Sequence, residues 1–195
     1  MAQSKEQRLW QACTDGDLEA VRELASDPAV DFNWVGEDRL DTPFHRACRF
    51  GWLEIMKVLL EQEKIEVNKG NKGDASPFFV ACQEDHKEVV SLLLAGPRID
   101  PNKPNNRGIT PFCTACEKGH KEVISLLLAD PRVTGVTPFN IACRRGHKEV
   151  VSLLLADPRI DPNMPRNDQC TPPVGCLPEW SPRGRAAPVG LGKGN

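Results

Sequence analysis

TPFHRAC, at residues 42–48, recurs as SPFFVAC at 76–82, TPFCTAC at 110–116 and TPFNIAC at 137–143. The first two offsets are 34 residues each, whereas the third, from Thr110 to Thr137, is 27 residues. A period of about 20 to 50 residues is typical of repeat architectures, in which each unit packs against its neighbours. The sequence therefore predicts an array of similar units, with seven residues missing at one junction.

A second block follows each copy of this motif. It reads GWLEIMKVLLEQEKIEVN at 51–68, DHKEVVSLLLAGPRIDPN at 85–102, GHKEVISLLLADPRV at 119–133 and GHKEVVSLLLADPRIDPN at 146–163. A looser copy of the whole unit, LWQACTDGDLEAVRELASDPAVDFN, occupies residues 9–33. These blocks extend the predicted array to five units.

Each unit is predicted to form two helices joined by a turn. The Thr or Ser before Pro caps the first helix, because its hydroxyl accepts a bond from a free backbone N–H and Pro suits the first turn. This helix should span about eight residues and end at Gly51, Gly119 and Gly146 in their units, since a left-handed residue is needed there. The second helix starts at HKE and ends shortly before the proline that follows LLLA.

The pattern T-P-F-x-x-A-C, then G-H, then E-V-V-S-L-L-L resembles the ankyrin repeat, whose pattern is near T-P-L-H-x-A-A-x-x-G-H-x-x-I-V-x-L-L-L. The resemblance covers roughly residues 4–165. It implies an all-α solenoid of helix-turn-helix units with short β-hairpins or loops between them. This chain departs from the family pattern in having Phe where the family has Leu, and in keeping the family His only at His45.

The predicted units are an N-terminal capping repeat at 1–36, repeats at 37–70, 71–104, 105–131 and 132–165, and a degenerate repeat start with a tail at 166–195. The repeat at 105–131 lacks its following hairpin, and we expect a tight turn near Thr134–Gly135 instead. We expect a disordered tail, because residues 169–195 hold five Pro and five Gly. Whether the tail caps the last repeat, and whether the chain is a truncated product, stays open.

Composition excludes several classes of protein. Apolar residues make up 39% of the chain, charged residues 27%, and the net charge is −2, so bulk charge does not suggest nucleic acid. No apolar run approaches the roughly 18 residues of a membrane span, and the start, MAQSKEQRLW, has no apolar segment of a secretory signal. We therefore expect an intracellular protein, cytoplasmic or nuclear, with no membrane or nucleic-acid partner.

The eight cysteines are interpreted as free thiols. Cys48, Cys82, Cys116 and Cys143 recur at one position per unit, and units stacked about 8–10 Å apart cannot bring four such sulfurs to one metal. They are predicted to be small core residues. A thiol redox or metal role for Cys113 and Cys116, which are spaced C-x-x-C, is the alternative.

No candidate for catalysis stands apart from the repeat. His86, His120 and His147 recur at the opening of the second helix, which favours a turn-stabilising hydrogen bond in each unit. The sequence has no Gly-rich phosphate loop and no zincin helix. We expect a non-enzymatic protein with no cofactor, no metal and no small-molecule substrate.

The resemblance implies that a partner protein binds the concave face of the array, through hairpin tips and the two residues before each G-H turn. These pairs vary between units while the flanking residues repeat, as expected of a changeable surface on a fixed frame. The pairs are Arg49 and Phe50, Gln83 and Glu84, Glu117 and Lys118, and Arg144 and Arg145, and the tips are Arg39, Lys72 and Arg107.

Two further features bear on binding. Residues 1–66 carry 14 acids and 8 bases, a net charge of −6, whereas residues 67–195 carry 13 acids and 17 bases, a net charge of +4. Trp34 and Trp52 are expected to pack in the core, with an exposed aromatic patch as the alternative. The predicted function is a protein-interaction scaffold; the alternative is an adaptor or fragment that presents a substrate to an enzyme.

Overall fold

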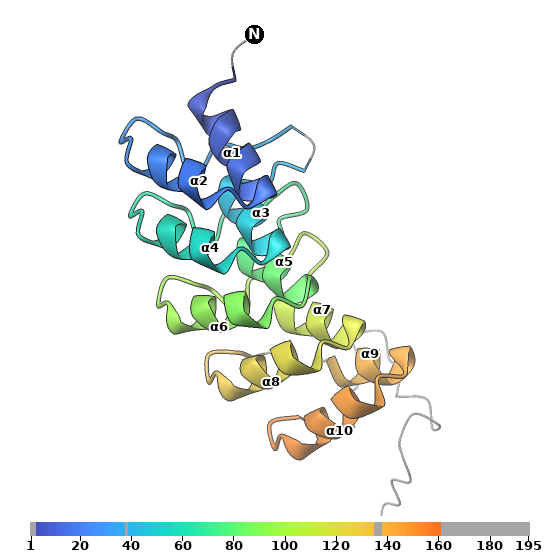
Figure 1. The fold of residues 1–195 in the computed structure, drawn as a ribbon. Helices are drawn as coiled ribbons and strands as arrows, with labels where there is room; N and C mark the ends of the chain where they lie inside the picture. The colour runs from blue at the N-terminus through green and yellow to red at the C-terminus, as the bar shows by residue number, and fades with distance from the viewer. Residues whose placement is uncertain (1–2, 38, 135–137, 161–195) are drawn as a thin grey trace, which may run out of the picture.

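The computed structural model describes residues 3–37, 39–134 and 138–160 of the 195-residue chain. These residues form ten helices and no strand. The inner row consists of α1 (Lys5–Asp15), α3 (Pro43–Phe50), α5 (Pro77–Gln83), α7 (Pro111–Lys118) and α9 (Pro138–Arg145). The outer row consists of α2 (Leu18–Ala25), α4 (Leu53–Leu60), α6 (Lys87–Ala95), α8 (Lys121–Ala129) and α10 (Lys148–Ala156). Each helix contacts the next helix of its own row, so the predicted all-α solenoid is confirmed (Figure 1).

The inner helices begin as the sequence predicts. The hydroxyls of Thr42, Ser76 and Thr110 accept hydrogen bonds from the backbone N–H of the third residue after each, at 3.3, 3.1 and 3.2 Å. A proline follows each of these residues at the first helical position. These bonds satisfy N–H groups that have no partner within the helix.

The turn between the two helices of a unit needs a left-handed residue. Gly51 and Gly119 adopt φ values of +74° and +81°, and Asp85 takes this position in the third unit with φ +64°. A Cβ atom on Gly51 would also lie 2.5 Å from Nδ1 of His86, a residue of the next unit. Glycine therefore serves both the turn and the close approach of the neighbouring repeat.

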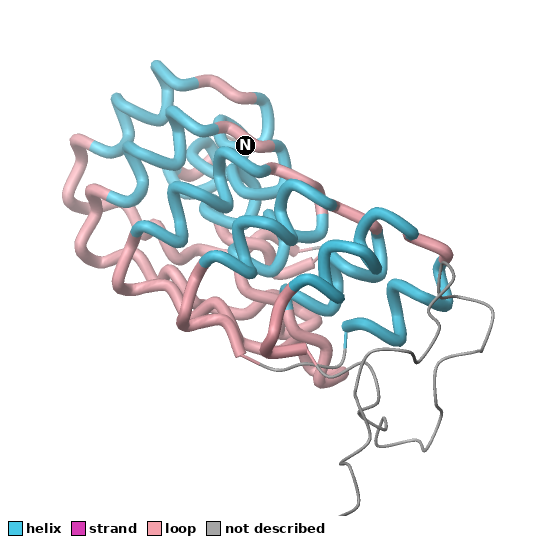
Figure 2. Tube along the Cα trace, turned by 90° about the horizontal axis from the view of Figure 1, so that it is seen from below, coloured by secondary structure: helices cyan, strands magenta, loops and turns pink. Residues whose placement is uncertain are grey.

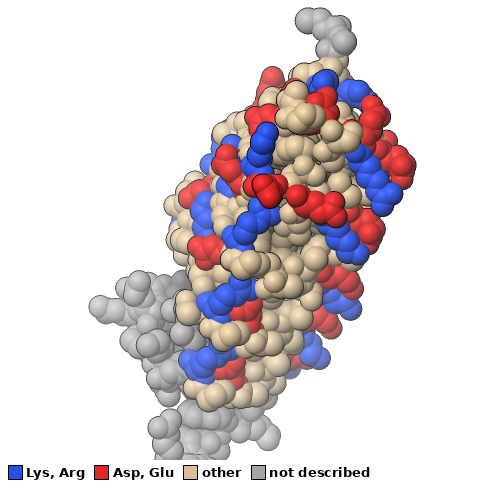
Figure 3. Space-filling view, turned by 90° about the vertical axis from the view of Figure 1, so that its left-hand side faces the viewer, with Lys and Arg blue, Asp and Glu red and all other residues tan. Residues whose placement is uncertain are grey.

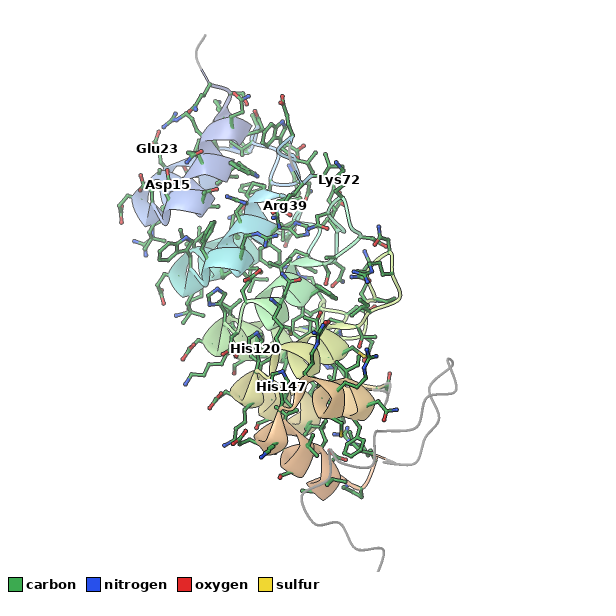
Figure 4. All side chains as sticks on the ribbon, turned by 90° about the vertical axis from the view of Figure 1, so that its right-hand side faces the viewer. Asp15, Glu23, Arg39, Lys72, His120 and His147 are labelled. Atoms are coloured by element: carbon green, nitrogen blue, oxygen red, sulfur yellow. The ribbon has the colours of Figure 1, made fainter. Side chains whose placement is uncertain are left out.

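The recurring histidines join neighbouring units. Nε2 of His86 lies 2.8 Å from the carbonyl oxygen of Arg49, and His120 and His147 make the same bond to Gln83 and Glu117 at 3.0 and 2.9 Å. His120 and His147 follow one another along the array (Figure 4). We expected a bond within each unit; the acceptor instead belongs to the preceding inner helix, whose last carbonyls have no partner within that helix.

Asparagines make a second set of bonds between units. Nδ2 of Asn68 donates to the carbonyl of Arg98 at 2.7 Å, and its Oδ1 accepts from the N–H of Asp100 at 2.9 Å. Asn33 and Asn102 bind the following loops in the same way. The loops lie together along one side of the array (Figure 2), and these amides hold them in register.

The core is one continuous cluster from Leu9 to Ile160. The recurring cysteines are 0% to 2% exposed, which confirms them as core residues. Leu93 of α6 is completely buried. No helix within the described ranges is long and apolar enough to cross a membrane.

The array continues across the short third offset. Helix α9 packs against α7, and α10 packs against α8. The predicted tight turn falls partly outside the described residues, because Gly135 is not among them, and the tail prediction also lies outside them. Where the hairpins are described they are turns closed by few backbone bonds, such as Asn105 N–H to the Ile109 carbonyl at 2.9 Å, rather than paired strands.

His45 is a buried polar residue at the start of α3. Its Nε2 donates to the carbonyl of Ala75 at 3.0 Å, and its Nδ1 accepts from the N–H of Thr42 at 3.2 Å. The bond to Nδ1 requires the neutral imidazole, because both ring nitrogens are donors in the protonated form. Burial lowers the pKa of His45 to about 4, against opposing effects of the Ala75 carbonyl and the Asp41 carboxylate.

The unfolded chain should bind a proton at His45 near pH 6.5, before the folded chain does. We therefore predict that the free energy of unfolding falls by up to about 3 kcal/mol as the pH drops from about 6.5 to about 4. His45→Asn, which introduces the residue found at Asn140 in the matching position, should show a shallower pH dependence in urea denaturation. If His45→Asn left the dependence of the unfolding free energy on pH unchanged, the assignment of this dependence to His45 would be wrong.

Leu93→Asp should destabilise the middle of the array by more than about 4 kcal/mol, because it removes a buried side chain and buries an unpaired charge. Thermal melting followed by circular dichroism measures the loss. Ser91→Asp, at an exposed position of the same helix, is the matched control and should melt near the wild-type temperature. Equal melting of both variants would show that the core assignment is wrong.

Candidate protein-binding face

The candidate face is the surface formed by the free side of the inner row and by the hairpin loops at 36–37 with 39–41, at 70–75 and at 105–109. The outer row forms a different surface. There, Lys and Arg are interspersed with Asp and Glu, so this side carries no patch of a single charge (Figure 3).

A buried carboxylate organises the candidate face at the first two units. Asp41 is 1% exposed, and its Oδ2 lies 3.2 Å from Nη2 of Arg49 and 3.7 Å from Nη1 of Arg46. Its Oδ1 accepts from Nδ2 of Asn71 at 2.9 Å, and its carbonyl accepts from Nε1 of Trp10 at 2.9 Å. One acidic residue therefore connects the first unit, α3 and the next hairpin.

Arg46 forms the bridge between this buried network and the surface. Its guanidinium carbon lies 4.4 Å from the ring centroid of Trp10 and 5.0 Å from that of Phe50, and Nε donates to Thr14 at 3.0 Å. Burial lowers the pKa of Arg46, and Asp41 opposes that effect. Phe50 remains 40% exposed, so this stack presents an aromatic ring beside a cation.

Our sequence interpretation missed the roles of Asp41 and Arg46, although a signal was present. Arg46 is a charged residue in a column that otherwise holds Val80, Thr114 and Ile141. Such a residue needs a nearby acid, and Asp41 stands directly before the TPF motif. Comparing units column by column would have found the pair.

The side chains of the predicted pairs differ in how strongly other residues of the chain hold them. Arg49 is held between Asp41 and Glu84, with Nη1 3.2 Å from Oε1 of Glu84 and a side chain only 14% exposed. Gln83 donates to the same Glu84 oxygen at 2.8 Å. Arg145 pairs with Glu117. The Arg49–Glu84 and Arg145–Glu117 pairs link neighbouring units across the candidate face.

The other predicted residues are exposed. Lys118 lies at the end of α7 and Arg144 near the end of α9. Arg39 and Lys72 lie side by side at the hairpin ends (Figure 4), where the Lys72 N–H donates to the Arg39 carbonyl at 2.8 Å. Arg107 is exposed on the third hairpin.

A groove of about 470 Å³ opens on the candidate face between α5, α7, the third hairpin and the start of α10. It brings together five predicted residues from three units, whereas Arg49, Phe50, Arg39 and Lys72 lie nearer the N-terminus. The residues that line it are Phe79, Gln83, Asn105, Arg107, Ile109, Thr114, Glu117, Lys118, Arg145 and His147.

Trp52 fits the alternative in which an aromatic side chain is exposed instead of packed in the core. Its side chain is 38% exposed, and it packs against Gly16, where a Cβ atom would lie 2.8 Å from the ring. Trp34 is half-buried and lines a second hollow together with Trp10. The expectation of full core packing is therefore wrong for Trp52, because its ring covers a turn of the first unit rather than entering the helix interface.

The alternative of a redox or metal role for Cys113 and Cys116 gains no support from further metal-binding side chains among the described residues. Cys113 is half-buried, whereas burial raises the pKa of the Cys116 thiol. The described part of the chain contains no group of three or more His, Cys, Asp or Glu residues placed to hold a metal ion.

Asp41→Ala should lower the free energy of unfolding by about 3 kcal/mol, because it leaves Arg46 and Arg49 without their shared carboxylate. Urea denaturation monitored by circular dichroism tests this. Glu63→Ala removes an exposed acid and should change stability by less than about 0.5 kcal/mol. If both variants lost the same stability, Asp41 would not organise the interface.

Residues 9–105 and 92–166 match the family described as "Ankyrin repeats (3 copies)", and together these matches cover most of the chain. No curated protein gives a significant match to the chain. The stacked helix pairs, the Gly-His turns and the family match agree, and the chain belongs to the ankyrin repeat family.

Proposed function

We propose that this protein is a non-enzymatic intracellular scaffold that binds a partner protein through the candidate face. Ankyrin repeats are generally protein–protein interaction modules. The observation that carries the proposal is a separation of roles along the inner helices: the Phe, Ala and Cys residues that recur in them are buried, whereas Phe50, Lys118, Arg144 and Arg145, at the two variable positions that follow, are exposed on one face.

The candidate face is already ordered before a partner binds, and this supports the proposal. The inner helices are tied to their neighbours by buried apolar contacts and by bonds such as His120 to Gln83, so few groups need ordering when a partner docks. Less ordering leaves more of the contact energy as affinity. The exposed Phe50 ring beside Arg46 has the residue types that dominate many interfaces.

Affinity capture from the native host, with quantitative mass spectrometry, tests the proposal. The baits are the wild type, a Phe50→Ala variant and an Arg144→Ala/Arg145→Ala variant, with Lys121→Ala/Lys148→Ala on the outer row as the matched control. We expect a partner that the wild type and the control retain and that at least one face variant recovers at less than about one tenth. Circular dichroism confirms that each bait is folded.

A partner that every folded face variant retains at the wild-type level, but that the outer-row variant loses, would contradict the proposal. It would place binding on the outer row.

A further inference from the structure

The groove on the candidate face has an uneven charge. Its lining includes the cations Arg107, Lys118 and Arg145 and one carboxylate, Glu117, which gives a net charge of +2. Its apolar part comes from the buried Phe79 and the half-buried Ile109. The groove is therefore a cationic hollow with a partly apolar lining.

The acids around the groove are already occupied. Glu117 pairs with Arg145, and Glu84 of the preceding unit pairs with Arg49. Within the described ranges, neither Lys118 nor Arg107 has an ion-pair partner. Two cations that line one groove therefore have no ion-pair partner among the residues that the structure describes.

The hairpin that carries Arg107 is the last one that the structure describes. The Lys72 N–H donates to the Arg39 carbonyl at 2.8 Å, and the Asn106 N–H donates to the Gly73 carbonyl at 2.9 Å. No described residue donates to the carbonyl of Arg107 in the corresponding way. In the sequence, the next unit follows after 27 residues instead of 34, so the segment that would make the next arm is shorter.

We propose that this groove binds an extended acidic segment of the partner protein, with carboxylates facing Arg107 and Lys118. This inference rests on the proposed function and names the chemistry of its partner. An α-helix about 10 Å wide would fill 470 Å³ within roughly one turn, whereas an extended chain can run through the groove. A small apolar side chain of the segment would pack on Phe79 and Ile109.

Charge argues against the chain's own C-terminal segment as the occupant. Residues 161–195 hold three acids and four bases, a net charge of +1, which does not complement a groove of +2. A second copy would have to offer residues from its first 66, where the net charge is −6, so self-association is a measurable competitor.

Fluorescence anisotropy with fluorescein-labelled decaglutamate tests the inference directly, with labelled decaglutamine as the neutral probe. We expect the full chain to bind decaglutamate at least tenfold more tightly than decaglutamine, and binding to weaken as the salt concentration rises. Arg107→Gln/Lys118→Gln should weaken decaglutamate binding at least fivefold. Lys121→Gln/Lys148→Gln, which removes the same charge from exposed outer-row positions, should leave it within twofold.

Several results would overturn the inference: equal binding of both probes, equal weakening by both double variants, or no binding of decaglutamate. Displacement of decaglutamate by a synthetic 161–195 peptide at equal concentration would instead assign the groove to the chain's own segment. A dimer in sedimentation velocity that Arg107→Gln/Lys118→Gln dissociates would assign it to a second copy.

This experiment separates the two proposals. If decaglutamate does not bind while capture of the cellular partner still depends on Phe50 or on Arg144 and Arg145, the acidic segment is wrong and the scaffold function stands. If decaglutamate binds as expected while capture depends on the outer row alone, the scaffold proposal for this face is wrong.

Discussion

No unit of this protein can bury its own apolar side chains, because two helices of seven to eleven residues leave one face uncovered. Stacking on a neighbour supplies that cover, and the result is a single core that runs from Leu9 to Ile160. Since helix-to-helix contacts carry this stacking, the array continues from α7 to α9 across the junction that lacks seven residues. The hairpin arm can therefore change length without interrupting the solenoid.

Apolar stacking alone does not set the register of one unit on the next, but polar side chains do. His86, His120 and His147 bind carbonyls of the preceding inner helix, and asparagines such as Asn68 bind both edges of the following loop. Each such bond satisfies a backbone group that would otherwise lack a partner. With register determined by the repeated residues, the columns that face outward are free to differ between units.

The first two units add a different kind of interface. Asp41, Arg46 and Arg49 form a charged network where the third and fourth units carry Ala75 or Ile109, Val80 or Thr114, and Gln83 or Glu117. A buried ion pair adds less stability than its Coulomb attraction suggests, because both groups lose water. Its clearest consequence here is positional: it holds the Phe50 ring beside a cation at the surface of the candidate face.

The sequence by itself determined the repeat, the helix pairs, their capping residues and the buried cysteine column, because all of these depend on spacing along the chain. It did not determine which units the recurring histidines join, nor that Arg49 is held by Asp41 and Glu84 while Lys118 has no ion-pair partner among the described residues. The histidine bonds and the Arg49–Glu84 pair join residues that are separated by about one repeat in sequence and only a few ångströms in space. Only the stacking of neighbouring units brings such residues together, so the tertiary structure decided which predicted surface residues are available to a partner.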